Sequence, residues 1–235
     1  MKYLYLFFLS LIPSIVILTF IYLSDKEKEP KKLLVKLFLG GIGACFLTLL
    51  LTFLLKVFIP FLQVEPDELG KTPILQFLYC FLLIGGIEES SKWIFNYELV
   101  WNSKEFDELY DSIVYAVFVS LGFATFENIF YVLEGGTSTA IARSLTSVPA
   151  HASFGIIMGY YIGMSKLTSI NGNNKLSSRY RFLSILLPAL VHGFYDFCLY
   201  SESIFLFFIF VAFLIFIYVG AIQKIKQFKR VKINL

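Results

Sequence analysis

The chain has 235 residues, of which 57% are hydrophobic and only 16% are charged, and its mean hydropathy is +0.75. A soluble domain is about half apolar and about a quarter charged, so this composition excludes an ordinary soluble protein. The formal net charge of +3 is too small to favour nucleic acid as a partner. The apolar residues fall in long blocks, which indicates that the lipid bilayer surrounds most of the chain.

Seven blocks are long and apolar enough to cross a bilayer, which takes about 20 residues of helix. Lipid offers the backbone no hydrogen-bond partners, so each block is predicted to be a helix. The predicted fold is all-α: a multi-pass transmembrane helical bundle of about seven spans, forming a single membrane domain over residues 1–235. The spans are expected near residues 3–23, 33–62, 73–95, 112–133, 141–164, 182–200 and 204–222.

The distribution of Lys and Arg predicts the orientation. These residues gather in the loop after the first span, in the loop after the fifth span, and in the tail from Lys224 to Lys232. The alternate side has little more than Lys2, Lys71 and Arg143. Because Lys and Arg accumulate on the cytoplasmic side of membranes, we expect an N-terminus outside the cell and a C-terminus in the cytoplasm.

The third span contains the first group of ionisable residues, Glu88, Glu89 and Lys92. Charged side chains inside a bilayer cost at least about 2.5–3.5 kcal/mol, and proteins retain them where partners or function compensate. An internal ion pair with Lys92 accounts for one glutamate. Adjacent residues point about 100° apart on a helix, so the second carboxylate is available for chemistry.

The fourth span contains Glu127, which has no cation within a helical turn. Such a carboxylate needs a partner on another helix or a bound proton, unless it reaches interfacial water near the helix end. Counted along the spans, Glu88 and Glu127 lie on opposite sides of the membrane midplane, separated by roughly 13 Å at 1.5 Å per residue. These two carboxylates can touch only if a span boundary or a helix is shifted, which Gly85-Gly86 and Gly122 would allow.

The fifth and sixth spans contain the two histidines. Arg143, Pro149 and His151 fall in the fifth span, where a lone histidine is often only a packed, hydrogen-bonded residue. In the sixth span, His192 and Asp196 are four residues apart and share a helix face. A carboxylate in that position can fix the tautomer of the ring, although a simple polar pair between helices is the plainer interpretation.

Together these groups suit hydrolysis inside a membrane. A buried glutamate can take a proton from water, and an imidazole or a protonated carboxyl can stabilise an oxyanion. The motifs G-x-S-x-G and H-E-x-x-H are absent. Glu and His are possible metal ligands, but the usual ligand spacings are missing. We therefore expect neither a metal nor any other cofactor.

At these residues the chain resembles the PrsW-type intramembrane proteases, which belong with the membrane glutamic proteases that include the type II CAAX prenyl endopeptidases. Each motif alone is common, and their order in successive spans makes the match specific. The matching segments are Glu88-Glu89-x-x-Lys92, SLGFATFENIFY with Phe123-x-x-x-Glu127, Arg143 followed by Pro149-x-His151, the Gly155/Gly159/Gly163 helix, and His192-x-x-x-Asp196.

The resemblance implies a role for each of these residues. Glu88 would be the base that activates water, Glu89 would pair with Lys92 or order the site, and His192 with Asp196 would stabilise the oxyanion. The prenyl endopeptidases carry a histidine where Glu127 stands and an arginine one position beyond Lys92. Because of these departures, the prenyl endopeptidases imply no role for Glu127 or Lys92. The departures leave His151 to supply an imidazole, and they argue against prenylated substrates.

The implied function is the first (site-1) cut in a single-pass anti-sigma factor, which releases a sigma factor in envelope-stress signalling. Two other functions use the same residues. A proton- or cation-coupled transporter would relay ions through the buried carboxylates and histidines, and a non-catalytic scaffold would hold a partner's helix. Reconstituted protein that moves ions without cutting a substrate would favour the transporter. Full biological function after Glu88→Ala would favour the scaffold.

Overall fold

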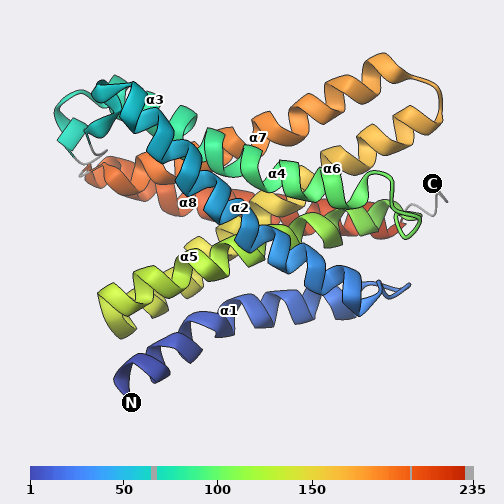
Figure 1. Cartoon of the computed structure of the whole chain (residues 1–235), viewed down its shortest axis with the longest axis horizontal. Helices are drawn as coiled ribbons and strands as arrows, with labels where there is room; N and C mark the ends of the chain where they lie inside the picture. The colour runs from blue at the N-terminus through green and yellow to red at the C-terminus, as the bar shows by residue number, and fades with distance from the viewer. Residues whose placement is uncertain (65–67, 202, 231–235) are drawn as a thin grey trace.

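A computed structural model of the chain describes residues 1–64, 68–201 and 203–230 (Figure 1). Every regular element of this described part is helical, which confirms the predicted all-α fold. Short 3-10 turns cover Pro60–Gln63 and Glu68–Lys71, and a π-helix, Tyr79–Gly85, joins α3 to α4. The α-helices are α1 (Lys2–Ser24), α2 (Lys31–Phe58), α3 (Pro73–Leu78), α4 (Gly86–Val100), α5 (Leu109–Leu145), α6 (Ser147–Ile170), α7 (Asn174–Tyr200) and α8 (Ile204–Arg230).

Six stretches of the described chain are long and apolar enough to cross a membrane, and one of them, Leu109–Ile170, has 62 residues. As a straight helix it would extend about 93 Å, three times the roughly 30 Å hydrocarbon core. It therefore holds two passes, α5 and α6, which brings the number of passes to seven. An odd number agrees with Figure 1, where the start of α1 and the end of α8 lie toward opposite ends of the long axis.

The chain reverses direction at Gly136, inside the element labelled α5. Gly136 has φ 75° and ψ −158°, a left-handed backbone conformation that glycine adopts without a steric penalty. Along a straight helix, Arg143 would lie about 24 Å from Glu127, yet an Arg143 guanidinium nitrogen is 3.0 Å from a Glu127 carboxylate oxygen. The turn between the predicted fourth and fifth spans therefore falls at Gly136, and Arg143 belongs to the returning segment.

Several predicted boundaries were wrong because the helices do not end where the apolar blocks end. The second span was predicted to reach Leu62, but α2 ends at Phe58, just before Pro60, which cannot continue the helix. In the other direction, the third span extends to Val100, the sixth begins at Asn174 instead of Phe182, and the seventh continues to Arg230. Lys232, part of the basic tail, lies outside the described residues.

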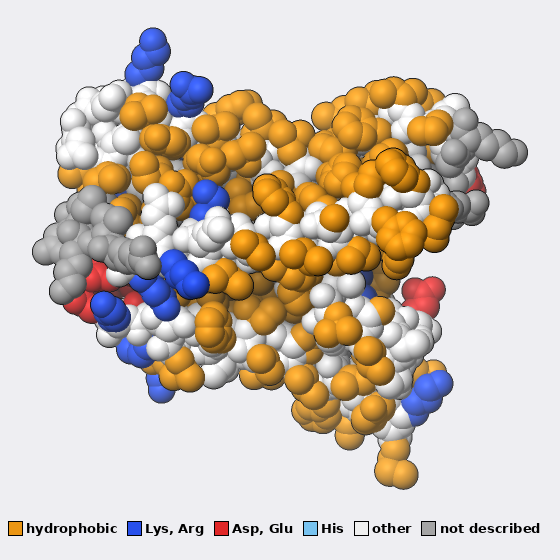
Figure 2. All heavy atoms as spheres, turned by 180° about the vertical axis from the view of Figure 1, so that it is seen from behind, with side chains coloured by type: hydrophobic (Ala, Val, Ile, Leu, Met, Phe, Trp, Pro, Cys, Tyr) orange, Lys and Arg blue, Asp and Glu red, His pale blue; other side chains and the backbone are white. Residues whose placement is uncertain are grey.

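The α5 helix runs through the middle of the bundle, and all residues from Leu109 to Thr125 are buried. Around it, α1, α2, α7 and α8 turn large apolar side chains outward, among them Phe53, Phe207 and Phe216. Figure 2 shows hydrophobic side chains over most of one face, with Lys and Arg gathered mainly toward one end. This surface suits lipid, and the buried α5 packs against α4 and α6, two of the helices that contribute residues to the site.

Candidate active site

One cavity of about 210 Å³ brings together six of the eight predicted site residues. Its lining extends from His192 to Tyr200, the last residue of α7, toward the end of the bundle where α5 reverses. Glu89 and Lys92 lie fully buried behind the cavity wall. The predicted residues that line the cavity are Glu88, Glu127, Arg143, His151, His192 and Asp196, and the other lining residues are Ile84, Tyr131, Ser147, Tyr195, Leu199 and Tyr200.

Two glycines bring the glutamate pair against α7. A Cβ added at Gly85 would lie 2.4 Å from the Ala189 carbonyl oxygen, and one added at Gly193 would lie 2.6 Å from the Phe81 Cα. Only glycine permits such close backbone contact, which is a common way for membrane helices to pack. Gly85 is the last residue of the π-helix, an irregularity often found at functional sites. Glu88 and Glu89 follow three and four residues later, in the first turn of α4, and therefore meet His192.

Lys92 connects three helices. Its ammonium group donates a hydrogen bond to Glu89 Oε1 at 2.7 Å and to His151 Nδ1 at 3.1 Å, and it lies 3.6 Å from Glu88 Oε2. It also lies over the Phe123 ring, 4.0 Å from the centroid, where the ring's quadrupole attracts a cation. The ammonium group thus contacts residues of α4, α5 and α6. Its positive charge compensates part of the negative charge of Glu88 and Glu89.

His192 is held on both sides of its ring. Its Nδ1 donates to Glu89 Oε1 at 2.8 Å, because a carboxylate can only accept. Its Nε2 faces Asp196 Oδ2 at 3.3 Å and Glu88 Oε2 at 3.9 Å. Phe154 stacks on the ring with a centroid distance of 4.8 Å. The imidazole therefore presents Nε2 to the cavity in a fixed orientation.

His151 bridges Lys92 and Glu127 through the two nitrogens of its ring. Its Nδ1 accepts from Lys92, so in the neutral ring Nε2 carries the proton. That nitrogen lies 3.1 Å from Glu127 Oε2, to which it donates. The backbone carbonyl of His151 also accepts from the Ser120 hydroxyl at 2.6 Å. Both ring nitrogens of His151 are therefore engaged by the protein itself.

Arg143 links Glu127 and Asn128 of α5 to the segment that follows the turn at Gly136. Its guanidinium bonds Glu127 Oε2 at 3.0 Å and Asn128 Oδ1 at 2.8 Å. The Asn128 amide in turn donates to the Ser10 carbonyl of α1 at 2.8 Å. This chain of hydrogen bonds ties α1, α5 and the returning segment together at the cavity.

Two carboxylate oxygens in the cavity, Glu88 Oε2 and Asp196 Oδ2, are buried without a hydrogen-bond partner in the described structure. The cluster contains four carboxylates, those of Glu88, Glu89, Glu127 and Asp196, but only two permanent cations, Lys92 and Arg143. Two negative charges remain to be balanced, by protons or by a bound cation. Unsatisfied buried oxygens of this kind are rare and indicate where a water, a proton or an ion belongs.

The partners differ in part from those expected along single helices. Asp196 was expected to orient His192, but the shorter contact to the ring comes from Glu89. His151 has no carboxylate at helical spacing, yet Glu127 of α5 supplies one. Glu88 and Glu127 do not touch: the path between them runs through Lys92 and His151, with steps of 3.6, 3.1 and 3.1 Å.

Sequence reasoning missed several residues of the site. Asn128, fully buried, links Arg143 to α1, and its place directly after Glu127 was the available signal. Tyr131 and Tyr200 line the cavity, but tyrosines near the ends of membrane helices are ordinary interface residues. Nothing in their spacing distinguishes them from such residues.

Comparison with known proteins identifies the family. Residues 29–221 match the family described as PrsW family intramembrane metalloprotease. The chain belongs to the PrsW family of intramembrane proteases. Proteins named Protease PrsW are 35% identical in Geobacillus kaustophilus, 33% in Bacillus subtilis and 37% in Oceanobacillus iheyensis. The matches cover 92%, 93% and 92% of this chain and 89%, 93% and 92% of those proteins.

PrsW membership confirms the predicted resemblance and establishes a protease, in place of the transporter or the scaffold. No solved structure is significantly similar to this chain. The cavity is thus the candidate active site of an intramembrane protease.

The family description includes the word metalloprotease, so the fit of the site to a metal matters. Glu88, His151 and His192 each offer a ligand atom, and these three atoms lie within 4.8 Å of one another. Glutamate and histidine are suitable ligands for zinc and similar ions. The Glu88 oxygen that makes no hydrogen bond in the described structure and the two uncompensated negative charges also suit a divalent cation. The residues present therefore fit a metal ion.

Proposed function

We propose that this protein makes the first (site-1) cut in a single-pass anti-sigma factor and so releases a sigma factor in envelope-stress signalling. The observation that carries the chemistry is the pairing of Glu88 with His192. Glu88 lines the cavity, and its Oε2, which makes no hydrogen bond in the described structure, lies 3.9 Å from His192 Nε2. A proton acceptor and a rigidly held donor therefore face the same small space.

Glu88 is the general base in this proposal. Its cavity-facing oxygen takes a proton from water as the water oxygen attacks the carbonyl carbon of the scissile peptide. The carbonyl oxygen becomes negatively charged, and protonated His192 donates a hydrogen bond to it from Nε2. Glu88 then gives its proton to the leaving amine nitrogen as the C–N bond breaks. Every proton is accounted for within the pair and the water.

Glu89 is a positioning residue that the reaction does not contact. It accepts from His192 Nδ1 and from Lys92, which fixes the ring and favours the imidazolium. Asp196, 3.3 Å from Nε2, supports the same protonated form. The ring of His151 is held in place by hydrogen bonds to Lys92 and Glu127, and Arg143 in turn holds Glu127. This side of the cavity is therefore formed before a substrate backbone binds.

The position of the cavity suits a cut on the outer side of the membrane. The lining includes Tyr131, Tyr200 and Ser147, and these residues lie toward the end of the bundle that contains the N-terminus. The Lys and Arg pattern assigns this end to the outside of the cell. The small polar cavity suits an extended stretch of substrate backbone more than a bulky prenyl group.

If the family's metal is present, Glu88, His151 and His192 are the residues that would hold it. Such an ion supplies a more acidic water and a Lewis acid for the carbonyl oxygen. To serve as a ligand, His151 would have to give up its contact with Lys92 or with Glu127. In our proposal no metal ion is required: the ammonium group of Lys92 supplies the positive charge beside Glu88, and Glu88 remains the base.

The proposal is tested with purified protein in liposomes and a tagged single-pass anti-sigma factor. Wild-type protein is expected to cut on the outer side of the substrate's membrane span, and Glu88→Gln is expected not to cut. Glu98→Gln, which changes an exposed glutamate on the same helix, is the matched control and should cut normally. Cleavage of other single-pass proteins but of no anti-sigma factor would overturn the substrate, and a cytoplasmic cut site would overturn the orientation.

A further inference from the structure

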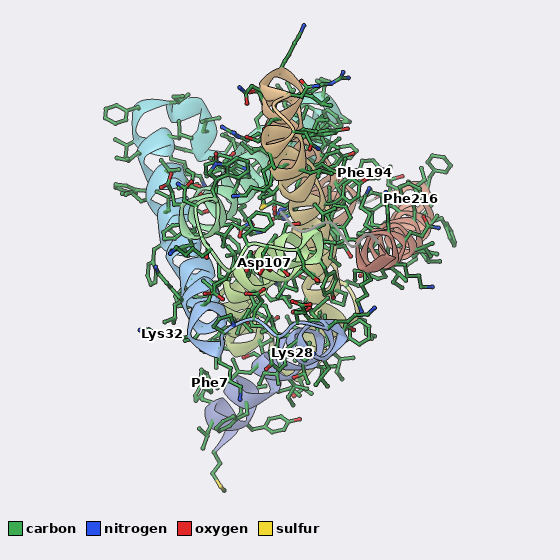
Figure 3. All side chains as sticks on the ribbon, turned by 90° about the vertical axis from the view of Figure 1, so that its right-hand side faces the viewer. Phe7, Lys28, Lys32, Asp107, Phe194 and Phe216 are labelled. Carbon is green, nitrogen blue, oxygen red and sulfur yellow. The ribbon has the colours of Figure 1, made fainter. Side chains whose placement is uncertain are left out.

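A second group of buried carboxylates lies at the opposite end of the bundle from the open end of the active-site cavity. Asp25 and Glu29 come from the connection between α1 and α2, and Asp111 from the first turn of α5. Their exposed fractions are 4%, 6% and 1%. One oxygen of each lies within 4.8 Å of the other two. Figure 3 looks onto this end, with Lys28 and Asp107 labelled on the two connections that flank the group.

Asp25 is aimed into this group without a partner. Both of its carboxylate oxygens are buried, and neither makes a hydrogen bond within the described structure. Burial raises the pKa of Asp25. A buried, unsatisfied carboxylate is costly and requires an explanation.

The other two carboxylates are already fixed in place. Glu29 Oε2 accepts from the Tyr115 hydroxyl at 2.7 Å. Asp111 Oδ2 accepts from the backbone N–H groups of Asp107 and Glu108, at 3.2 and 2.6 Å, as part of a helix capping box. These bonds hold the two side chains facing Asp25 before any ligand arrives.

The neighbouring cations do not neutralise the group. Lys28 Nζ donates to the backbone carbonyls of Tyr22, at 2.7 Å, and Asp25. Lys229 lies over the Tyr110 ring, 5.0 Å from its centroid. Among the described side chains, neither lysine forms an ion pair with the three carboxylates. Up to three negative charges therefore face one another in a buried space.

We propose that Asp25, Glu29 and Asp111 bind a hard divalent cation, Mg²⁺, Ca²⁺ or Mn²⁺. All three ligands are carboxylate oxygens, which such ions prefer, and the group contains no nitrogen or sulfur that would favour zinc or copper. Water completes the coordination, as is usual for Mg²⁺. The cation joins the α1–α2 connection to the start of α5, the helix that holds Glu127 sixteen residues further on.

The test is cation binding by the purified, metal-free full-length protein in detergent. Addition of MgCl₂, CaCl₂ or MnCl₂ is expected to raise the Tm by about 5–10 °C at a hundred-fold excess over Kd. An equal ionic strength of NaCl should not do so. Electron paramagnetic resonance should count one bound Mn²⁺ that survives Glu88→Gln, which removes a ligand from the active-site cavity.

Asp25→Asn should abolish both the Tm shift and the bound Mn²⁺. Glu27→Gln, an exposed carboxylate two residues away, should retain them. If Asp25→Asn does not fold, Glu29→Gln replaces it, because its amide oxygen can still accept from Tyr115. Wild-type protein that binds no Mn²⁺ and shows no Tm shift would overturn the proposal, as would binding that persists unchanged in both variants. Either result would leave protons as the groups that neutralise the cluster.

Discussion

Glu89 of α4 and His192 of α7, 103 residues apart in the chain, meet at 2.8 Å between Oε1 and Nδ1. The same carboxylate oxygen accepts from Lys92 at 2.7 Å. This one atom therefore couples the orientation of the imidazole to the ion pair inside α4. The adjacent Glu88 is left facing the cavity, which separates a positioning carboxylate from a reactive one.

Glu88→Gln is expected to lower the cleavage rate by about 10²–10⁴-fold, because glutamine keeps the shape of the side chain but cannot take a proton. The measurement is the initial rate of substrate cleavage in liposomes, with protein levels matched by immunoblot. Glu98→Gln serves as the control. Near-normal activity of the Glu88 variant would remove this residue from the role of base.

Glu89→Gln is expected to lower the rate by about 10–100-fold, as is typical when a residue that orients a functional histidine is changed. Because the loss acts through His192, the pH profile should shift while KM changes little. Glu89→Asp should recover part of the rate. If Glu89→Gln is more damaging than Glu88→Gln, the two roles must be exchanged.

His192→Ala is expected to cost more activity than His151→Ala. His192 presents Nε2 to the cavity, and loss of one preorganised oxyanion donor costs about 10²–10³-fold in rate. His151 has both nitrogens engaged by Lys92 and Glu127, so its loss should act mainly on stability and substrate fit. Cleavage assays at equal membrane abundance compare the two. An inactive His151→Ala beside an active His192→Ala would place the catalytic imidazole on α6.

Cleavage is expected to survive metal chelators, because Lys92 supplies positive charge beside Glu88 and His192 can carry a proton. The assay compares the purified protein before and after 1,10-phenanthroline and EDTA, with the metal content measured in parallel. Activity that disappears with the chelator and returns with zinc would instead assign Glu88, His151 and His192 as metal ligands.

Gly85→Ala is expected to destabilise the protein by about 1–3 kcal/mol, as overpacking of a close contact typically does. The added Cβ would lie 2.4 Å from the Ala189 carbonyl oxygen. Gly220→Ala on α8 is the matched control, since nothing lies within 4 Å of its added Cβ. Thermal unfolding in detergent measures both variants. Equal stability of the two variants would show that the α4–α7 contact is looser than the structure indicates.

The sequence was sufficient to predict an all-α, multi-pass fold and most of the ionisable residues that line the cavity. Apolar blocks of about 20 residues specify membrane helices, and an ionisable residue inside such a block stands out because burial is costly. Glu127 and His151 could each be identified as needing a partner. Their pairing could not be identified, because it depends on which helices become neighbours.

The partners of His192 illustrate the limit. Helical spacing identified Asp196 as a partner of His192. Glu89 lies on α4 and meets His192 only because Gly85 and Gly193 pack against each other. A single sequence does not show which residues of two helices will face each other. The acidic group of Asp25, Glu29 and Asp111 was hidden for a similar reason. Two of its members looked like ordinary loop residues, and the third lies more than 80 positions away.

The backbone contact between Gly85 and Gly193 also bears on how a substrate fits the site. Main chains in such close contact cannot slide past each other without breaking that contact, so Glu88 and His192 keep their relative positions. A substrate must therefore fit between two side chains whose spacing is already set.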